Sequence, residues 1–198
     1  PAHSEFGVWH HAHANEVHTR QEFSVVYRTN SIGARDVERE RASDHSRVVV
    51  LGDSFIEGWG VSEDQRLTNL LETSTGVEHL NFGMSHFGPY QSLLVYRNLA
   101  KKYSHDGLIV GVLPLNDFWD LDYKAAQTAL RYEYRFRPYL IGDYPQYERF
   151  DYREPILRRF FRRRFYTFNA FNMICRKLSS QKRPDLDQIA VNSGKRFP

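Results

Sequence analysis

A serine that could act as a nucleophile follows a short apolar run in this 198-residue sequence. Val48 to Leu51 are apolar, and Gly52-Asp53-Ser54 comes directly after them. A short apolar run bounded by turn residues is typical of a buried strand in a parallel sheet. Such a strand delivers its next residue to the carboxyl edge of the sheet, where open α/β folds bind their ligands. Ser54 is therefore a candidate for covalent catalysis.

Two further predicted strands end in polar or flexible loops. These loops are segment 81–88 (Asn-Phe-Gly-Met-Ser-His-Phe-Gly) and segment 114–117 (Pro-Leu-Asn-Asp). Neighbouring parallel strands would bring both loops to the edge that carries Ser54. Ester hydrolysis by serine needs a base and hydrogen-bond donors aimed at the developing oxyanion. We expect these donors to be the Ser54 N–H, a backbone N–H of segment 81–88 and the Asn116 amide.

The elements that must position these loops alternate between strand and helix. Strands are predicted at 23–28, 47–51, 77–81 and 107–113. Between the last three lie two helices, the first beginning at a capping box over 62–65 and the second spanning 91–103. This alternation predicts parallel strands joined by right-handed crossovers. The inward faces are predicted to carry Leu67, Leu70 and Leu71 in the first helix, and Leu94, Val95 and Leu99 in the second.

Composition and charge divide the chain into three regions. Residues 1–46 are predicted to be a His-rich, irregular segment with one strand, and residues 47–130 to form the α/β core. Residues 131–198 hold a Tyr/Arg-rich excursion, predicted as a hairpin, and a basic amphipathic helix. From residue 131 to 183 there are 14 Arg or Lys and 5 Asp or Glu residues, although the net charge of the chain is only +3. Such an asymmetry can mark a contact surface.

The basic helix is predicted at 156–178, with apolar residues recurring at steps of three or four. Its arginines could contact an anionic membrane surface or a protein partner, whereas nucleic acid is an unlikely partner. A solvated basic face over a packed aromatic stripe is the interpretation we favour. The arginines concerned are Arg158, Arg159, Arg162, Arg163 and Arg164.

Taken together, the three loops resemble the blocks of the SGNH (GDSL-type) hydrolases. Gly52-Asp53-Ser54-Phe55 resembles the first block, which bears the nucleophile, and segment 81–88 resembles the second. Leu115-Asn116-Asp117 resembles the third block, which supplies an asparagine. Segment 29–36 is similar to a stretch that precedes the first block in one bacterial branch. The resemblance extends from about residue 23 to residue 120, and more loosely to residue 178.

This sequence departs from the family pattern at three places. His86 stands where the second block usually has a glycine that donates its N–H, and Pro114 stands where the third block has glycine. The last block of the family, an Asp followed three residues later by His, is absent from the sequence. Either the sequence is the front part of a longer protein, or its catalytic machinery is incomplete. His86 as a substitute base is the less favoured reading, because its loop normally supplies a backbone donor.

The resemblance implies a three-layer α/β/α sandwich with a flavodoxin-like parallel sheet, in which the first three strands have the order 2-1-3. It also implies a serine esterase that acts on small-molecule or carbohydrate acyl esters through a Ser54 acyl-enzyme. Ser54, His86 and Asn116 would carry the reaction, and no cofactor or metal is required. Two alternatives stay open: an O-acyltransferase of the same fold, and a catalytically incomplete domain that binds glycan or membrane.

Other features of the sequence support weaker readings. His10, His11, His13 and His18 lack partners at a recognised metal-ligand spacing, so a surface segment is preferred to a metal site. The glycines near Ser54 do not match a phosphate-binding loop. No apolar run reaches the roughly 18 residues of a membrane span. The first residues lack the apolar core of a signal peptide, and because an upstream signal or anchor could have been removed, the sequence does not choose between cytoplasm and cell envelope.

Overall fold

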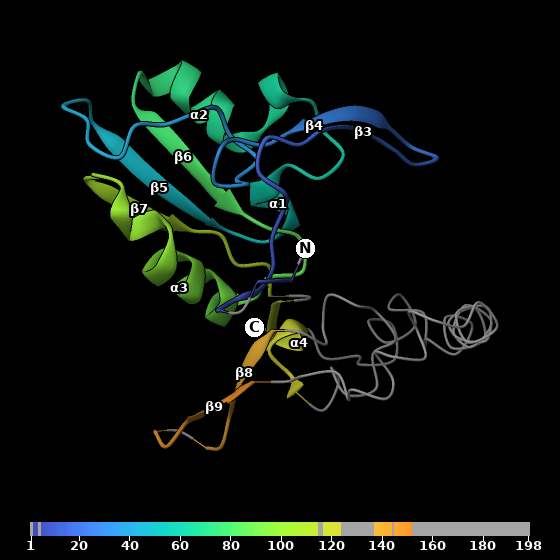
Figure 1. The fold of residues 1–198 in the computed structure, drawn as a ribbon, viewed down its shortest axis with the longest axis vertical. Coiled ribbons are helices and arrows are strands. Elements are labelled where there is room, and N and C mark those ends of the chain that lie inside the picture. The colour runs from blue at the N-terminus through green and yellow to red at the C-terminus, as the bar shows by residue number, and fades with distance from the viewer. Residues whose placement is uncertain (1, 4, 115–116, 124–136, 144, 152–198) are drawn as a thin grey trace, which may run out of the picture. The chain divides into compact units, whose positions relative to one another are not determined.

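A computed structural model describes residues 2–3, 5–114, 117–123, 137–143 and 145–151 (Figure 1). The chain divides into two units, residues 1–153 and 154–198. All described residues belong to the first unit. The predicted helix at 156–178, with its five arginines and their proposed membrane contact, lies outside the described residues.

A parallel sheet of three strands forms the centre of the described part. Its strands are β5 (Arg47–Gly52), β6 (Glu78–Gly83) and β7 (Gly107–Val110), in the order β6-β5-β7. Val50 of β5 pairs with Asn81 on one side and with Ile109 on the other. The first predicted core strand therefore lies between the second and the third, which confirms the order 2-1-3 and the α/β class.

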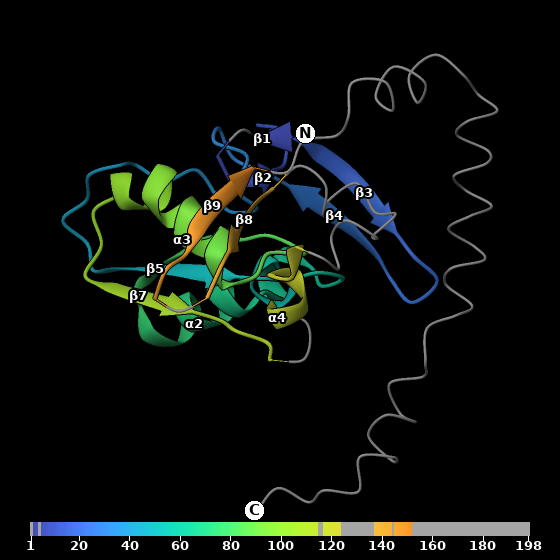
Figure 2. The same ribbon diagram turned by 90° about the horizontal axis from the view of Figure 1, so that it is seen from below.

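Helices lie on both faces of this sheet (Figures 1 and 2). Between β5 and β6 the chain forms α1 (Ser54–Glu57), the 3₁₀ helix η1 (Glu63–Gln65) and α2 (Leu67–Thr75). Between β6 and β7 it forms α3 (Pro89–Asn98) and the 3₁₀ helix η2 (Ala100–Lys102). The two connections run to opposite sides of β5, and because both crossovers are right-handed, α2 and α3 lie on opposite faces.

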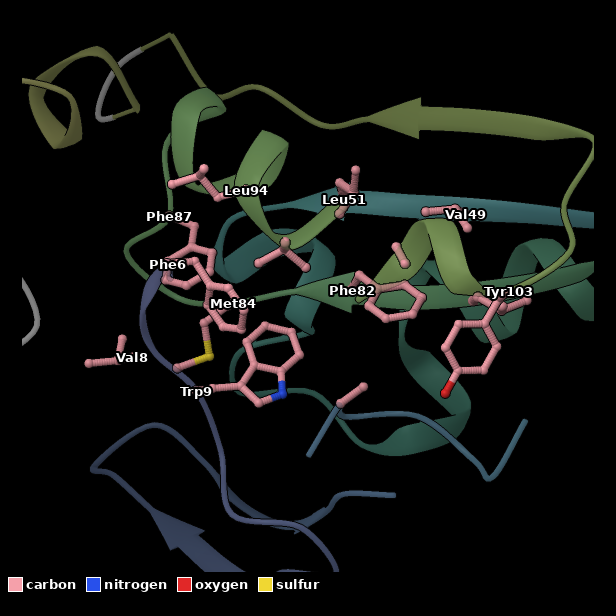
Figure 3. Packing of buried hydrophobic residues seen from close by; sticks show 14 residues of the cluster. Phe6, Val8, Trp9, Val49, Leu51, Phe82, Met84, Phe87, Leu94 and Tyr103 are labelled. Carbon is pink, nitrogen blue, oxygen red and sulfur yellow. The ribbon is translucent and has the colours of Figure 1, made fainter. Parts of the chain in front are cut away.

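The hydrophobic core lies between the sheet and α3 (Figure 3). Alternate residues of β5 and β6 point to this side of the sheet. Leu94 and Val95 of α3 pack against them, as the sequence predicts. The strand residues are Val49, Leu51, Leu80 and Phe82. The N-terminal segment completes the cluster with Phe6 and Trp9, whose rings lie 6.3 Å from that of Phe87.

The expected inward face of α2 is wrong for two of its three leucines, and the third, Leu71, is partly buried. Leu67 and Leu70 are 43% and 52% exposed, and Thr68 is the residue that the helix buries. The sheet surface beneath α2 is polar, because Asn81 Nδ2 donates to the carbonyl of Ile56 over 2.8 Å and lies 3.4 Å from Thr68 Oγ1. A threonine can satisfy this surface and a leucine cannot, so the helix buries Thr68 and leaves Leu67 and Leu70 exposed.

The N-terminal region contains more strands than the sequence predicts. Strand β4 (Ser24–Arg28) confirms the strand predicted at 23–28, but it pairs in antiparallel fashion with β3 (Asn15–Thr19), in a stretch expected to be irregular. The short strands β1 (Ala2–His3) and β2 (Gly7–Val8) also pair. Because β3 is polar except for one valine, it shows no apolar alternation, and only its pairing reveals it.

The Tyr/Arg-rich excursion forms the predicted hairpin in its described part. Strands β8 (Pro138–Ile141) and β9 (Glu148–Asp151) pair in antiparallel fashion, and Gly142 begins the turn with a φ of 104°. A positive φ of this size favours glycine. The short helix α4 (Asp117–Asp120) precedes the excursion. None of the helices in the described part has the length and apolar character that crossing a membrane would require.

Replacing two leucines tests this packing. We expect Leu51→Ala to lower the free energy of unfolding by about 2–5 kcal/mol, because it empties a fully buried site. Leu70→Ala should change it by less than about 0.5 kcal/mol, because Leu70 is exposed. Urea denaturation of both variants measures the difference. An equally large loss for Leu70→Ala would contradict the outward orientation of this side chain.

Candidate functional site

The ends of the three parallel strands meet around Ile56 of α1. A Cβ added at Gly52 would lie 2.5 Å from Ile56 Cγ1, one at Gly83 2.7 Å from its Cβ, and one at Gly111 2.9 Å from its Cγ1. The Met84 N–H donates to the Gly52 carbonyl over 3.0 Å. Only glycine leaves room for so close an approach. The predicted convergence of these strand ends at one edge is therefore confirmed.

Ser54 begins α1 directly after β5. Its neighbour Asp53 is 2% exposed and caps the helix, because its Oδ1 accepts the Phe55 N–H over 3.0 Å. Ser54 itself is partly exposed, and the Phe55 side chain beside it is 69% exposed. Among the described residues no hydrogen bond reaches Ser54 Oγ. Ser54 therefore lies at the carboxyl edge of the sheet, where the sequence predicts it.

Arg35 holds the other end of α1. Its guanidinium donates to the carbonyl oxygens of Glu57 over 3.1 Å and of Val61 over 2.7 Å, and also to that of Gly58. It lies 3.7 Å from the centre of the Tyr27 ring. Carbonyl groups at a helix C-terminus lack partners within the helix, and a buried cation can satisfy them. Segment 29–36, to which the sequence alone assigns no role, thus supports the helix that begins with Ser54.

Asp36 ties the same segment to β6. Its carboxylate accepts the Asn81 N–H over 3.1 Å and the Arg39 Nε–H over 3.3 Å. Burial raises the pKa of Asp36, and the positive charge of Arg39 opposes this effect only in part. Asn81 in turn donates to the Ile56 carbonyl of α1. Helix α1 and strand β6 are therefore linked through one buried polar network.

Glu57 connects the Ser54 helix to the loop after β6. Its carboxylate is 1% exposed, lies 2.7 Å from His10 Nε2, and accepts hydrogen bonds from the Ser85 N–H over 2.7 Å and from the Ser85 hydroxyl. Burial alone raises the pKa of Glu57, but the hydrogen bonds from His10 and Ser85 outweigh burial and hold the pKa below its ordinary value. His10 therefore pairs with this carboxylate. Among the described residues, no group of three or more His, Cys, Asp or Glu is placed to hold a metal ion.

His86 lies in the same loop with a φ of 69°. This left-handed conformation favours glycine, which is the residue that the family resemblance assigns to this position. The His86 carbonyl accepts a hydrogen bond from Arg137 Nη1, and the residue is partly exposed. The backbone thus keeps a glycine-like shape although a histidine occupies it.

The third predicted donor, Asn116, lies outside the described residues. Asp117, which follows it, is buried at 1% exposure, and its Oδ2 accepts the Leu113 N–H over 2.7 Å. In the described chain Asp117 Oδ1 and Asp53 Oδ2 are buried without a hydrogen-bond partner. Burial and the nearby carboxylates of Asp53 and Asp120 raise the pKa of Asp117 to about 6. A carboxyl that titrates near pH 6, well above the usual range of an aspartate, therefore lies close to the Ser54 turn.

The sequence predicts which residues could react, but it does not reveal the buried charged residues that hold the loops and helix α1 in place. Arg35, Asp36, Glu57 and Arg137 are all buried charged residues, and none belongs to a periodic pattern. Comparisons with protein-family models, with curated proteins and with solved structures found no match to this chain.

The raised pKa of Asp117 predicts that the free energy of unfolding depends on pH. An unfolded Asp titrates at 3.8 and the folded Asp117 at about 6, so between these values the folded protein binds more protons and its free energy of unfolding falls as pH rises. The difference corresponds to roughly 3 kcal/mol. Asp117→Asn stays neutral and keeps an oxygen for the Leu113 N–H, so it should gain stability over the wild type between pH 4 and pH 7.

Urea denaturation of the wild type and Asp117→Asn at several pH values measures this gain. Asp44→Asn, at an exposed position, is the matched control and should follow the wild type. A constant difference between Asp117→Asn and the wild type across this range would contradict the raised pKa.

Proposed function

We propose that this chain carries the nucleophile and the oxyanion loops of a serine esterase of the SGNH type, in a three-layer α/β/α sandwich. The observation that carries the proposal is the placement of Ser54. This partly exposed residue follows the central strand of a 2-1-3 parallel sheet, at the edge where the loop after β6 also lies. The proposed substrates are small acyl esters, among them acetyl esters of carbohydrates.

The reaction begins when Ser54 Oγ attacks the carbonyl carbon of the ester and gives up its proton to a base. The carbonyl oxygen becomes an oxyanion, which the N–H groups of Ser54 and His86 and the Asn116 amide stabilise. One such donor lowers the barrier by about 3–4 kcal/mol. The bond to the alcohol then breaks, and the base returns the proton to the departing oxygen. Water releases the acyl group from Ser54 by the same steps.

The base in this scheme is a histidine oriented by a carboxylate. All nine histidines of the sequence lie in the described part, so we place this pair outside these 198 residues. His10 already faces Glu57 with its Nε2, and in the described part no imidazole contacts Ser54 Oγ. A serine hydroxyl is a weak nucleophile unless a base removes its proton. Turnover therefore depends on that pair, whereas the nucleophile and the oxyanion donors of the proposal are Ser54, His86 and Asn116 of this chain.

Ser54→Ala tests the nucleophile directly. In a protein that also contains this base, we expect hydrolysis of p-nitrophenyl acetate, and a loss of at least about 1,000-fold in kcat for Ser54→Ala. Ser62→Ala, at a serine away from the strand ends, is the matched control. A fluorophosphonate should label the wild type and Ser62→Ala but not Ser54→Ala. Equal turnover by Ser54→Ala and the wild type would rule out the proposal.

Intermediate outcomes separate the alternatives. Acylation of Ser54 without further turnover would indicate that the nucleophile is present and its base is missing. Transfer of the acyl group to an added sugar in preference to water would indicate an acyltransferase. An absence of fluorophosphonate labelling would support the domain that binds without turnover.

His86→Gly distinguishes a backbone donor from a side-chain base. Glycine keeps the N–H and accepts the φ of 69°, so kcat should fall by less than about 10-fold. If the imidazole were the general base, the loss would reach about 100-fold or more. Steady-state kinetics on p-nitrophenyl acetate measures the ratio.

A further inference from the structure

The guanidinium of Arg137 joins three segments that are far apart in the sequence. Its Nη1 donates to the carbonyl oxygen of His86, and its Nη2 donates to the carbonyl oxygen of Asp120 and lies 3.5 Å from Asp120 Oδ1. Its Nε donates to the Tyr139 hydroxyl over 2.9 Å. Arg137 is 1% exposed. A buried cation is tolerated only when its N–H groups are paired, so these contacts constrain where each partner can lie.

His86 is held from both sides. On its N-terminal side Ser85 is bound through its N–H and its hydroxyl to Glu57, and on its C-terminal side the His86 carbonyl is bound to Arg137. The N–H of His86, the proposed oxyanion donor, belongs to the peptide group between these two anchors. A left-handed histidine is uncommon, and such a conformation persists only where its surroundings determine it fully.

The same guanidinium holds the helix that follows the third loop. Helix α4 begins at Asp117, directly after Asn116, and Asp120 lies one turn later. The second and third loops also meet directly, because a Cβ added at Gly88 would lie 2.8 Å from the Asp117 carbonyl oxygen. Arg137 is therefore bonded on one side to the loop of the second donor and on the other to the helix after the third.

We propose that Arg137 is a positioning residue that sets the spacing between the His86 N–H and helix α4, and with it the shape of the oxyanion hole. The inference rests on the proposed function. It makes the excursion that carries Arg137 a part of the active site. A misplacement of about 1 Å in reacting groups can lower a rate by about 100-fold, so a tie at this point has a large effect on turnover.

Arg47 provides a matched control for a purely structural role. It is 3% exposed, and it donates to Glu78 Oε2 over 2.5 Å and to the Glu40 carbonyl over 2.6 Å. It begins β5, and Ser54 lies beyond the opposite end of that strand. Its removal breaks the hydrogen bonds of a comparably buried guanidinium without touching the loops at the carboxyl edge.

The experiment compares Arg137→Lys and Arg137→Ala with Arg47→Lys and Arg47→Ala in the full chain. We expect the Arg137 variants to lower kcat for p-nitrophenyl acetate by about 10- to 100-fold with little change in KM. Guanidinium added to Arg137→Ala should restore part of kcat. The Arg47 variants should lose a similar amount of thermal stability and keep kcat within about twofold. Equal losses of kcat in both series, or a change confined to KM, would overturn the positioning role.

Hydrogen exchange tests the same inference without any activity. Amides in segments 84–88 and 117–121 should exchange at least about 10-fold faster in Arg137→Lys than in the wild type, and the Arg47 variants should leave them unchanged. If exchange responds in this way while Ser54 proves inert, the esterase proposal fails and the structural tie stands. If these amides exchange at the wild-type rate in Arg137→Lys, the inference itself is wrong.

Discussion

The buried carboxylate of Glu57 is the constraint on which the rest of the site depends. A charge that is 1% exposed must be paired, because an unpaired buried charge costs several kcal/mol. Its partners are His10 of the N-terminal segment and Ser85 of the loop after β6. Because Glu57 lies one turn after Ser54 on α1, satisfying this charge also places the second loop beside the candidate nucleophile. Pairing a single carboxylate therefore brings together three segments that the chain keeps far apart.

Buried arginines extend this principle across the carboxyl edge. Helix α1 has only four residues, and its terminal carbonyl groups gain partners from Arg35. Arg137 does the same for the carbonyls of His86 and Asp120. A guanidinium has five N–H donors in a planar fork, so one side chain can satisfy several loop carbonyls at once. Regular secondary structure is short in this part of the molecule, and these side chains supply the order that longer helices would otherwise provide.

The strands and the turns were predictable where a local pattern carried the information. The run from Val48 to Leu51 is apolar because β5 is buried on both faces, and the glycines after it mark where α1 approaches the strand ends. Local patterns failed where the buried surface was polar. Thr68 displaced the leucines of α2 because Asn81 lies opposite, and β3 was missed because its pairing with β4 does not require apolar residues. The third donor, Asn116, stays a prediction, as does the basic helix at 156–178.

The sequence by itself determined the α/β class and the strand end at which Ser54 lies, because both follow from the period and placement of apolar residues. The strand order was implied by the resemblance to a known family and not by these patterns. Only the tertiary structure decided which charged residues are buried, and with which partners. His10 seemed to belong to a surface cluster of histidines, yet it binds Glu57, 47 positions away. Arg137 lay in a stretch set apart from the core, yet it is bonded to the loop of His86. The energy of a buried charge depends on groups that folding brings to it, and a one-dimensional pattern does not contain that information.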